Sequence, residues 1–182
     1  MEENAEKINK TFRRFLKQTP TRVGGISVKF YKDRFVRGGW IDTSFQKWRP
    51  RKKRDRNERR RGNRALLVQS GRLKRSIRVL AKNEKSVRVG TDVEYAKAHN
   101  EGDTSTSNET VRTHTRRAHS RRNRSGRRGD VKGSTVKSHN RKTKRNLPKR
   151  QFMGRSKFLN RRIEKTLKHQ LKKELKKDGI ID

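Results

Sequence analysis

The five histidines are the residues whose side chains most readily bind metals or transfer protons. His114 and His139 take matching places in a repeated segment, TVRTHTRR at residues 110–117 and TVKSHNRK at residues 135–142, and we expect them to face each other across a hairpin. Two imidazoles fall short of the three or four ligands that a zinc site needs, and cationic neighbours oppose a dication. We therefore expect no metal and no cofactor.

The other candidate catalytic groups match no known arrangement. Ser70 precedes Gly71 but lacks the flanking pattern of a nucleophile elbow, and no GxxxxGK phosphate loop occurs. His99, in EYAKAH, is interpreted as a packed, hydrogen-bonded residue beside Tyr95. A carboxylate pair is a weak signal because the acids between residues 42 and 103 are scattered: Asp42, Asp92, Glu94, Glu101 and Asp103. The absence of cysteine excludes thiol chemistry and disulfides. Because none of these groups forms a catalytic arrangement, we predict a protein that is not an enzyme and has no small-molecule substrate.

Positive charge is the strongest chemical signal. The chain has 55 Lys and Arg against 18 Asp and Glu, a formal net charge of +37. Residues 112–150 hold sixteen Lys or Arg and one acid, and such a segment releases counterions when it binds a phosphate backbone. This segment contains no Phe, Trp or Tyr, and the next aromatic residue is Phe152. We therefore expect contacts to phosphates without base stacking or sequence preference. The alternative is that the segment contacts acidic protein neighbours.

The two repeated segments are predicted to pair as the strands of an inserted β-hairpin arm at residues 103–146, with a loose tip at residues 121–130. In each copy, Val and small polar residues alternate along the strand with basic residues and His. Residues 104–108, TSTSN, are expected to form a loop. The predicted contacts to nucleic acid or a partner are the cations of this arm: Arg112, Arg116, Arg117, Arg121, Arg122, Arg124, Arg127, Arg128, Lys137, Arg141, Lys142, Lys144 and Arg145.

The elements that must position these residues have little apolar material. Only 26% of the chain is hydrophobic and 40% is charged, so the sequence favours a small core with extensions. We predict an amphipathic helix over residues 2–18 that ends at Pro20, then a short strand or hairpin over residues 24–40 between glycine pairs. Residues 47–64 carry a net charge of +9 and are expected to form a flexible basic loop.

The most foldable part follows this loop. Ser70 is expected to cap a short helix, with two strands after it over residues 79–82 and 87–89, and a helical turn over residues 95–98. A long C-terminal helix is predicted from Ser156 until Gly179. The expected fold class is α+β in a single domain, residues 1–182: a small antiparallel sheet packed with an N-terminal helix and a long C-terminal helix, plus the protruding basic β-hairpin arm. The longest aliphatic run, residues 65–68, is too short for a membrane span, so we expect a soluble protein made in the cytoplasm.

Three blocks of sequence resemble, in order, the virion-morphogenesis and tail-completion family of tailed bacteriophages, the group of the phage Mu-type morphogenesis protein. The blocks are LLVQSGRLKRSIRV, then VRVGT with EYAKAHNEG, and LPKRQFMGRS. The matching family motif comprises Leu67, Ser70, Gly71, Leu73, Ser76, Ile77, Val89, Gly90, Thr91, Tyr95, Ala96, His99, Gly102, Leu147, Pro148, Arg150, Phe152 and Gly154.

The resemblance covers the chain from about Trp40 into the C-terminal helix, with the arm as a long variable insertion. It implies a small α+β domain that assembles as a ring at the head-to-tail junction of the virion, helps to complete or join the tail, and performs no catalysis. The implied partners are copies of the same chain, a portal or head-completion adaptor, tail tube or tail terminator proteins, and double-stranded DNA in transit. The alternative is a monomeric ribosomal-type or packaging-associated protein that coats nucleic acid.

Overall fold

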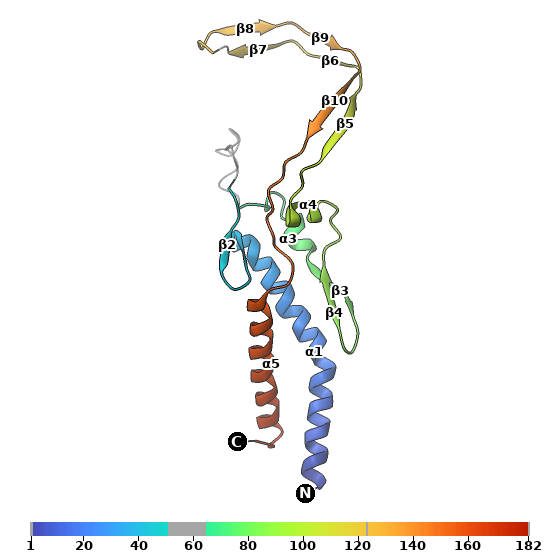
Figure 1. Cartoon of the computed structure of the whole chain (residues 1–182), viewed down its shortest axis with the longest axis vertical. Coiled ribbons are helices and arrows are strands. Elements are labelled where there is room, and N and C mark those ends of the chain that lie inside the picture. The colour runs from blue at the N-terminus through green and yellow to red at the C-terminus, as the bar shows by residue number, and fades with distance from the viewer. Residues whose placement is uncertain (1, 51–64, 123, 182) are drawn as a thin grey trace. The chain divides into compact units, whose positions relative to one another are not determined.

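The structure, a computed structural model, describes residues 2–50, 65–122 and 124–181 (Figure 1). The chain divides into two compact units. The first, which we call the core unit, consists of Met1–Gly102 and Pro148–Asp182, and the second, Asp103–Leu147, is the arm. Both helices and antiparallel strand pairs are present, so the predicted α+β class is confirmed, with the strands arranged as separate two-stranded ladders.

Helix α1 spans Glu2–Arg37 and passes through Pro20, where the sequence predicted its end. The prediction of a strand or hairpin at residues 24–40 is therefore wrong for residues 24–37, which are helical. The buried side chains Phe30 and Arg34 are four residues apart, which places them on one side of the helix, and the Arg34 guanidinium lies 4.4 Å from the centre of the Phe30 ring. Helical periodicity over the whole segment outweighs the short alternation that suggested a strand.

Two short hairpins follow α1. Strand β1, Gly39–Ile41, pairs with β2, Phe45–Lys47, and Gly38 takes a positive φ of 65° where the helix turns into β1. Most of the predicted basic loop at residues 47–64 lies outside the described residues. The second hairpin consists of β3, Arg78–Lys82, and β4, Val87–Gly90, close to their predicted positions.

Two short helices flank the second hairpin. Helix α3, Arg72–Ser76, precedes it, and its N-cap is Gly71 rather than the predicted Ser70. The Ser70 hydroxyl accepts a hydrogen bond from the Arg72 N–H at 3.3 Å from one residue further out. Helix α4, Ala96–Glu101, follows it and ends at Gly102. Both helices were predicted, because each combines a local apolar turn with a nearby glycine, but α4 extends three residues beyond the predicted turn at residues 95–98.

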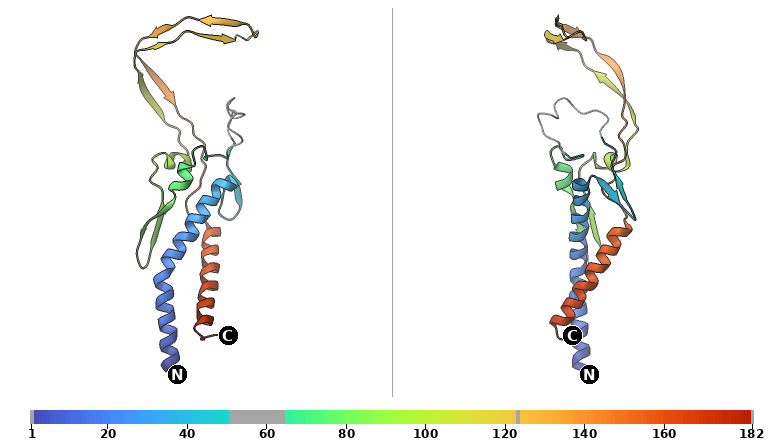
Figure 2. Two further views of the ribbon diagram at one scale, coloured as in Figure 1. Left: turned by 180° about the vertical axis from the view of Figure 1, so that it is seen from behind. Right: turned by 90° about the vertical axis from the view of Figure 1, so that its left-hand side faces the viewer.

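Helix α5, Lys157–Lys177, is the predicted C-terminal helix. Its N-cap is Ser156, whose hydroxyl accepts a hydrogen bond from the Leu159 N–H at 3.1 Å. Helix α5 lies beside α1 (Figure 2), and charged groups join the two helices near the C-terminal end of α5. Asp178 accepts hydrogen bonds from the Thr11 hydroxyl at 2.5 Å and from Arg14 at 2.6 Å, and Arg22 pairs with Glu174.

The core unit has two small clusters of buried apolar side chains. One gathers residues from α1, α3, α4 and the loops around them: Phe35, Trp48, Leu73, Ile77, Val93, Ala96 and Phe152. The other consists of Phe30, Trp40 and Leu159, and holds the start of α5 against α1. Along the described residues, no helix is long and apolar enough to cross a membrane.

The arm is one long antiparallel hairpin whose ladder is divided into three segments. Near its base β5, Thr106–Val111, pairs with β10, His139–Lys144; then β6, His114–Arg116, pairs with β9, Ser134–Val136; and β7, His119–Arg122, pairs with β8, Arg128–Val131. The pairing begins inside the expected TSTSN loop and continues into residues 121–130, where a loose tip was predicted. Both expectations are therefore corrected.

Candidate functional site

The three blocks of the family motif meet in the core unit. Ser76 of the first block and Thr91 of the second have hydroxyl oxygens 2.6 Å apart. The second and third blocks are joined by backbone contacts, since the Arg150 N–H donates to the His99 carbonyl oxygen at 2.8 Å, and the Asn100 side chain accepts from the Phe152 N–H at 2.9 Å. The motif residues thus hold the small helices and the segment before α5 together.

A cavity of about 470 Å³ lies where the three blocks meet. It is lined by leucines and by polar or aromatic side chains of the three blocks: Leu66, Leu67, Gln69, Ser70, Arg72, Leu73, Tyr95, His99 and Arg150. Arg150 is only 8% exposed, and its guanidinium donates to the Arg49 carbonyl oxygen at 3.2 Å. The buried arginine ties the third block to the chain that follows β2.

His99 matches its predicted surroundings in part. Its ring packs edge-on against Tyr95 with the ring centres 5.8 Å apart, as expected. Within the described part of the chain, however, Nδ1 is buried without a hydrogen-bond partner, so the predicted hydrogen bonding is not found for that atom. Burial lowers the pKa of His99, and the nearby charge of Arg150 lowers it further.

The arm brings its histidines together differently from the sequence prediction. His114 lies opposite Val136, and His139 lies opposite Val111, so the two histidines do not face each other. The physical reason is the register of an antiparallel hairpin, in which two copies of a motif run in opposite directions. No group of three His, Asp or Glu side chains forms a potential metal site among the residues that the structure describes.

The repeat in the arm is shorter than the eight residues visible in the sequence. Four five-residue units occur, two on each strand: VRTHT at residues 111–115, RRAHS at 116–120, VKGST at 131–135 and VKSHN at 136–140. In each unit the first residue ends one strand and the fourth begins the next. The second and third residues form a gap in the ladder, and they are always a cation followed by a small residue.

The gaps have local order of their own. Across one interruption of the ladder, the Thr113 hydroxyl accepts a hydrogen bond from the Ser138 N–H at 3.1 Å. In the three units that contain histidine, the ring Nδ1 lies within 3.3 Å of the carbonyl oxygen of the gap cation. Each histidine therefore fixes the backbone beside one cation, which is a structural role that the sequence interpretation missed.

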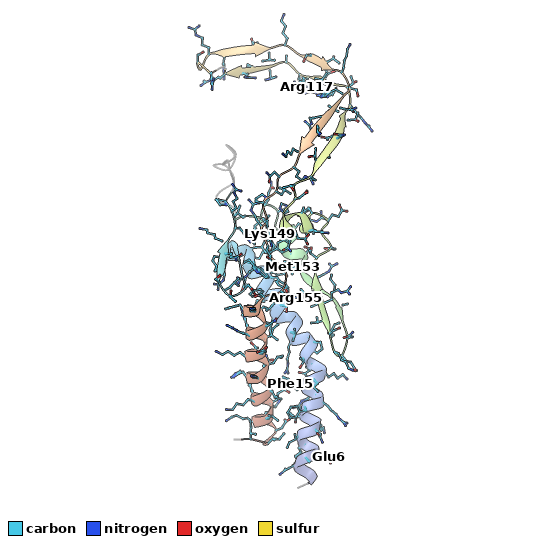
Figure 3. The ribbon with its side chains drawn as sticks, in the orientation of Figure 1. Glu6, Phe15, Arg117, Lys149, Met153 and Arg155 are labelled. Atoms are coloured by element: carbon cyan, nitrogen blue, oxygen red, sulfur yellow. The ribbon has the colours of Figure 1, made fainter. Side chains whose placement is uncertain are left out.

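The cations predicted as contacts are distributed along the whole arm (Figure 3, where Arg117 is labelled). Arg112, Arg117 and Lys137 lie in the gaps, and Arg124 and Arg127 lie at the tip. The other predicted cations lie on the strands or directly after β10: Arg116, Arg121, Arg122, Arg128, Arg141, Lys142, Lys144 and Arg145. Lys132 occupies the fourth gap and was missing from the predicted set, although the five-residue period identifies it.

The arm has little acid with which to neutralise this charge. Residues 103–147 hold fourteen Lys and Arg and three Asp and Glu, a net charge of +11. Two of the three acids are already paired, Glu109 with Arg141 at 2.7 Å and Asp103 with Arg145 at 3.7 Å. Hydrogen bonding to Arg141 lowers the pKa of Glu109. No described residue of the arm is buried, so its side chains are available to a partner.

The three blocks that meet in the core unit are the ones that resemble the virion-morphogenesis family in sequence. The model of the phage virion morphogenesis family matches residues 42–172, and the chain belongs to this family. Searches of curated proteins and of solved structures find no match. The family is a structural kind rather than an enzymatic one, which agrees with motif residues that pack and bond to one another.

Proposed function

We propose that the protein is a subunit of the head-to-tail junction of a phage virion, where it assembles into a ring and helps to join or complete the tail. Membership of the phage virion morphogenesis family, over a match that includes the arm, is the observation that carries this proposal. The subunit is made in the cytoplasm of the host bacterium and ends in the neck or tail of the particle. Its arms contact neighbouring subunits or DNA.

The surface of the core unit supports assembly with other chains. Leu16 on α1 is 60% exposed, Val36 is 70% exposed, and Leu80 on β3 is 45% exposed. A groove formed by the middle of α1 and the turn between β3 and β4 adds further apolar surface. Burial of such side chains against neighbours in a ring contributes about 25 cal/mol for each Å² removed from water.

The charge of the chain also supports a place beside other virion components. A subunit with a net charge of +37 repels its own copies unless polyanions or acidic proteins lie nearby. DNA that passes through a ring supplies such charge, and so do acidic surfaces of a portal or head-completion adaptor, or of tail tube or tail terminator proteins. These are the partners that we propose.

The test is the assembly state of the purified full chain in high salt, measured by light scattering and negative-stain imaging, alone and with the portal-side and tail-side proteins of its phage. We expect a closed ring of defined mass. A chain that remains monomeric with both sets of partners would contradict the proposal. In the phage itself, deletion of residues 110–144 is expected to yield heads and tails that do not join.

The second candidate function is that of a monomeric protein that coats nucleic acid, of a ribosomal or packaging-associated type. The observation in its favour is the arm, which carries a net charge of +11 without a core of its own. A monomer at every salt concentration that binds RNA and DNA alike, with an affinity that falls steeply with salt, would support this function over the ring.

A further inference from the structure

We propose that the arm is a DNA-binding ribbon that lies lengthwise in the major groove of double-stranded DNA and contacts the phosphates on both rims. The inference deepens the proposed function, because it names the partner of the arm. It rests on the proposed function only in taking the DNA to be that of the phage. It is carried by where the cations lie on the ribbon, by the gaps in its ladder, and by the side chains that the arm lacks.

The cations lie on both faces of the ribbon. Directly paired residues of an antiparallel ladder share a face, and neighbours along a strand point to opposite faces. In the segment nearest the tip, Arg122 and Arg128 are paired on one face, and Arg121 is on the other. Near the base, Lys142 and Arg141 are adjacent on β10 and therefore also point to opposite faces.

Cations on two faces distinguish between the candidate polyanions. An acidic protein surface contacts one face of a flat ribbon and leaves the cations of the other face in water. A DNA groove presents phosphates on two rims, with one negative charge for about every 1.7 Å of duplex. A ribbon that enters the groove edge-on turns one face to each rim, so both faces meet negative charge. The major groove is about 12 Å wide and admits a two-stranded β-ribbon. The arrangement of charge therefore favours duplex DNA over an acidic protein.

The gaps allow the ribbon to follow a curved path. Where the ladder is interrupted at residues 112–113 and 137–138, the ribbon changes direction (Figure 1). The ladder spans residues 106–122 on one strand, a contour of about 55 Å at about 3.3 Å per residue. A stiff ladder of this length would leave a groove that winds around the duplex, whereas a ladder with gaps can bend with it. The interruption at the bend carries two cations, Arg112 and Lys137.

The side chains that the arm lacks exclude the other common way in which β-ribbons bind DNA. Ribbons in the minor groove insert apolar side chains between base pairs and kink the duplex. The arm has no aromatic residue, and its apolar side chains beyond the base are three valines and an alanine. Arginine and lysine side chains without a wedge fit contacts to phosphates in the wider groove, with little dependence on base sequence.

The experiment measures binding of the full chain to a labelled DNA duplex of about 24 base pairs, which is longer than the ribbon, by fluorescence anisotropy over a series of salt concentrations. The test variant replaces the four gap cations with glutamine: Arg112→Gln, Arg117→Gln, Lys132→Gln and Lys137→Gln. We expect its affinity to fall at least about tenfold at moderate salt. The plot of log K against log salt should become less steep, with the magnitude of its slope reduced by about four.

The matched control removes the same charge from exposed positions of the core unit on α5: Lys165→Gln, Lys168→Gln, Lys172→Gln and Lys173→Gln. Its affinity is expected to stay within about twofold of the unchanged chain, because these lysines lie outside the ribbon. A third variant, with Arg112→Lys and Arg117→Lys, keeps the charge and is expected to retain binding. Circular dichroism and thermal unfolding of each variant show that the core unit remains folded.

Binding measurements with methyl green, netropsin, duplex RNA and poly-glutamate test the groove and the class of partner. Methyl green, which occupies the major groove, should displace the chain, and netropsin, which occupies the minor groove, should not. Duplex RNA, whose major groove is deep and narrow, should bind more weakly than DNA. Equal loss of affinity in the arm variant and the α5 variant would overturn the proposal, and so would equal binding of poly-glutamate and DNA. Ring formation is measured separately on the same samples, so a failure of DNA binding is distinguished from a failure of assembly.

Discussion

At the scale of single residues, His99 connects the family motif to pH. Its ring is packed against Tyr95 beside the cavity, and burial is the first cause of its lowered pKa. In the unfolded chain the imidazole has its ordinary pKa of 6.5 and takes up a proton more readily than in the fold. Above pH 6.5 the imidazole is neutral in both states, and its burial does not oppose folding. As the pH falls through 6.5 towards the lower folded pKa, the unfolded chain takes up a proton first, so the stability of the folded state decreases.

We predict that His99→Gln reduces this dependence on pH. The melting temperature of the unchanged chain should fall between about pH 7.5 and about pH 5, and that of the variant should fall less, because glutamine does not titrate. The matched control is His169→Gln, which replaces an exposed histidine on α5 and should leave the dependence unchanged. Identical pH profiles for the His99 variant and the unchanged chain would show that His99 does not contribute.

The residue scale also shows which residues chosen from the sequence lie in contact with one another. Ser76, Thr91 and Phe152 were selected through the family resemblance. The structure pairs the hydroxyl groups of Ser76 and Thr91 and buries Phe152 in an apolar cluster. The histidines of the arm were predicted less well, because the eight-residue match hid the shorter period. Recognition of RRAHS and VKGST as further units would have identified Lys132 and the gaps.

At the scale of elements, the contact between α1 and the β3–β4 hairpin depends on one glycine. A β-carbon on Gly24 would lie 2.9 Å from Cγ2 of Val79 and 3.1 Å from Cγ2 of Val87. Valine has little freedom to rotate away, since its χ1 is restricted. A β-carbon on the adjacent Gly25 would meet nothing within 4 Å.

These two glycines form a matched pair of substitutions. Gly24→Ala is expected to lower the free energy of unfolding by about 1–3 kcal/mol, because the extra methyl group overpacks the contact with the hairpin. Gly25→Ala is expected to raise it by about 0.5–1 kcal/mol, because alanine is the better helix former and has room. Urea denaturation followed by circular dichroism measures both. Stabilisation by both substitutions would mean that the hairpin does not pack on α1 at Gly24.

The same helix explains where prediction of the elements failed. Local signals at Pro20, Gly24 and Gly25 suggested a helix end and a turn, yet the helix continues because its buried face, including Phe30, packs against β1, β3 and α5. Tertiary packing outweighs local propensity in such a segment. Helix α5, by contrast, was predicted with its N-cap because the signal and the packing agree: Ser156 precedes a regular apolar stripe.

At the scale of the whole molecule, the two units should differ in what they need in order to fold. Among the residues that the structure describes, those in the apolar clusters of the core unit all lie outside the arm. At the base of the arm, Asp103 and Leu147 exchange backbone hydrogen bonds, with the Leu147 N–H 2.7 Å from the Asp103 carbonyl oxygen. The two ends are therefore close enough for a short loop to replace everything between them.

We predict that replacement of residues 104–146 by a short Gly-Ser loop leaves the core unit folded. Its stability should be unchanged or higher, by at most about 2 kcal/mol, because closing a shorter loop costs less chain entropy. Thermal unfolding followed by circular dichroism measures this stability. The variant should lose its affinity for duplex DNA, and it should still assemble if the core unit forms the ring. The control replaces residues 79–89 with the same loop and should abolish cooperative unfolding, because Val79 and Val87 pack against α1 at Gly24. Loss of cooperative unfolding on removal of the arm would mean instead that the arm belongs to the folding core, and that the charge it carries is part of what the fold must accommodate.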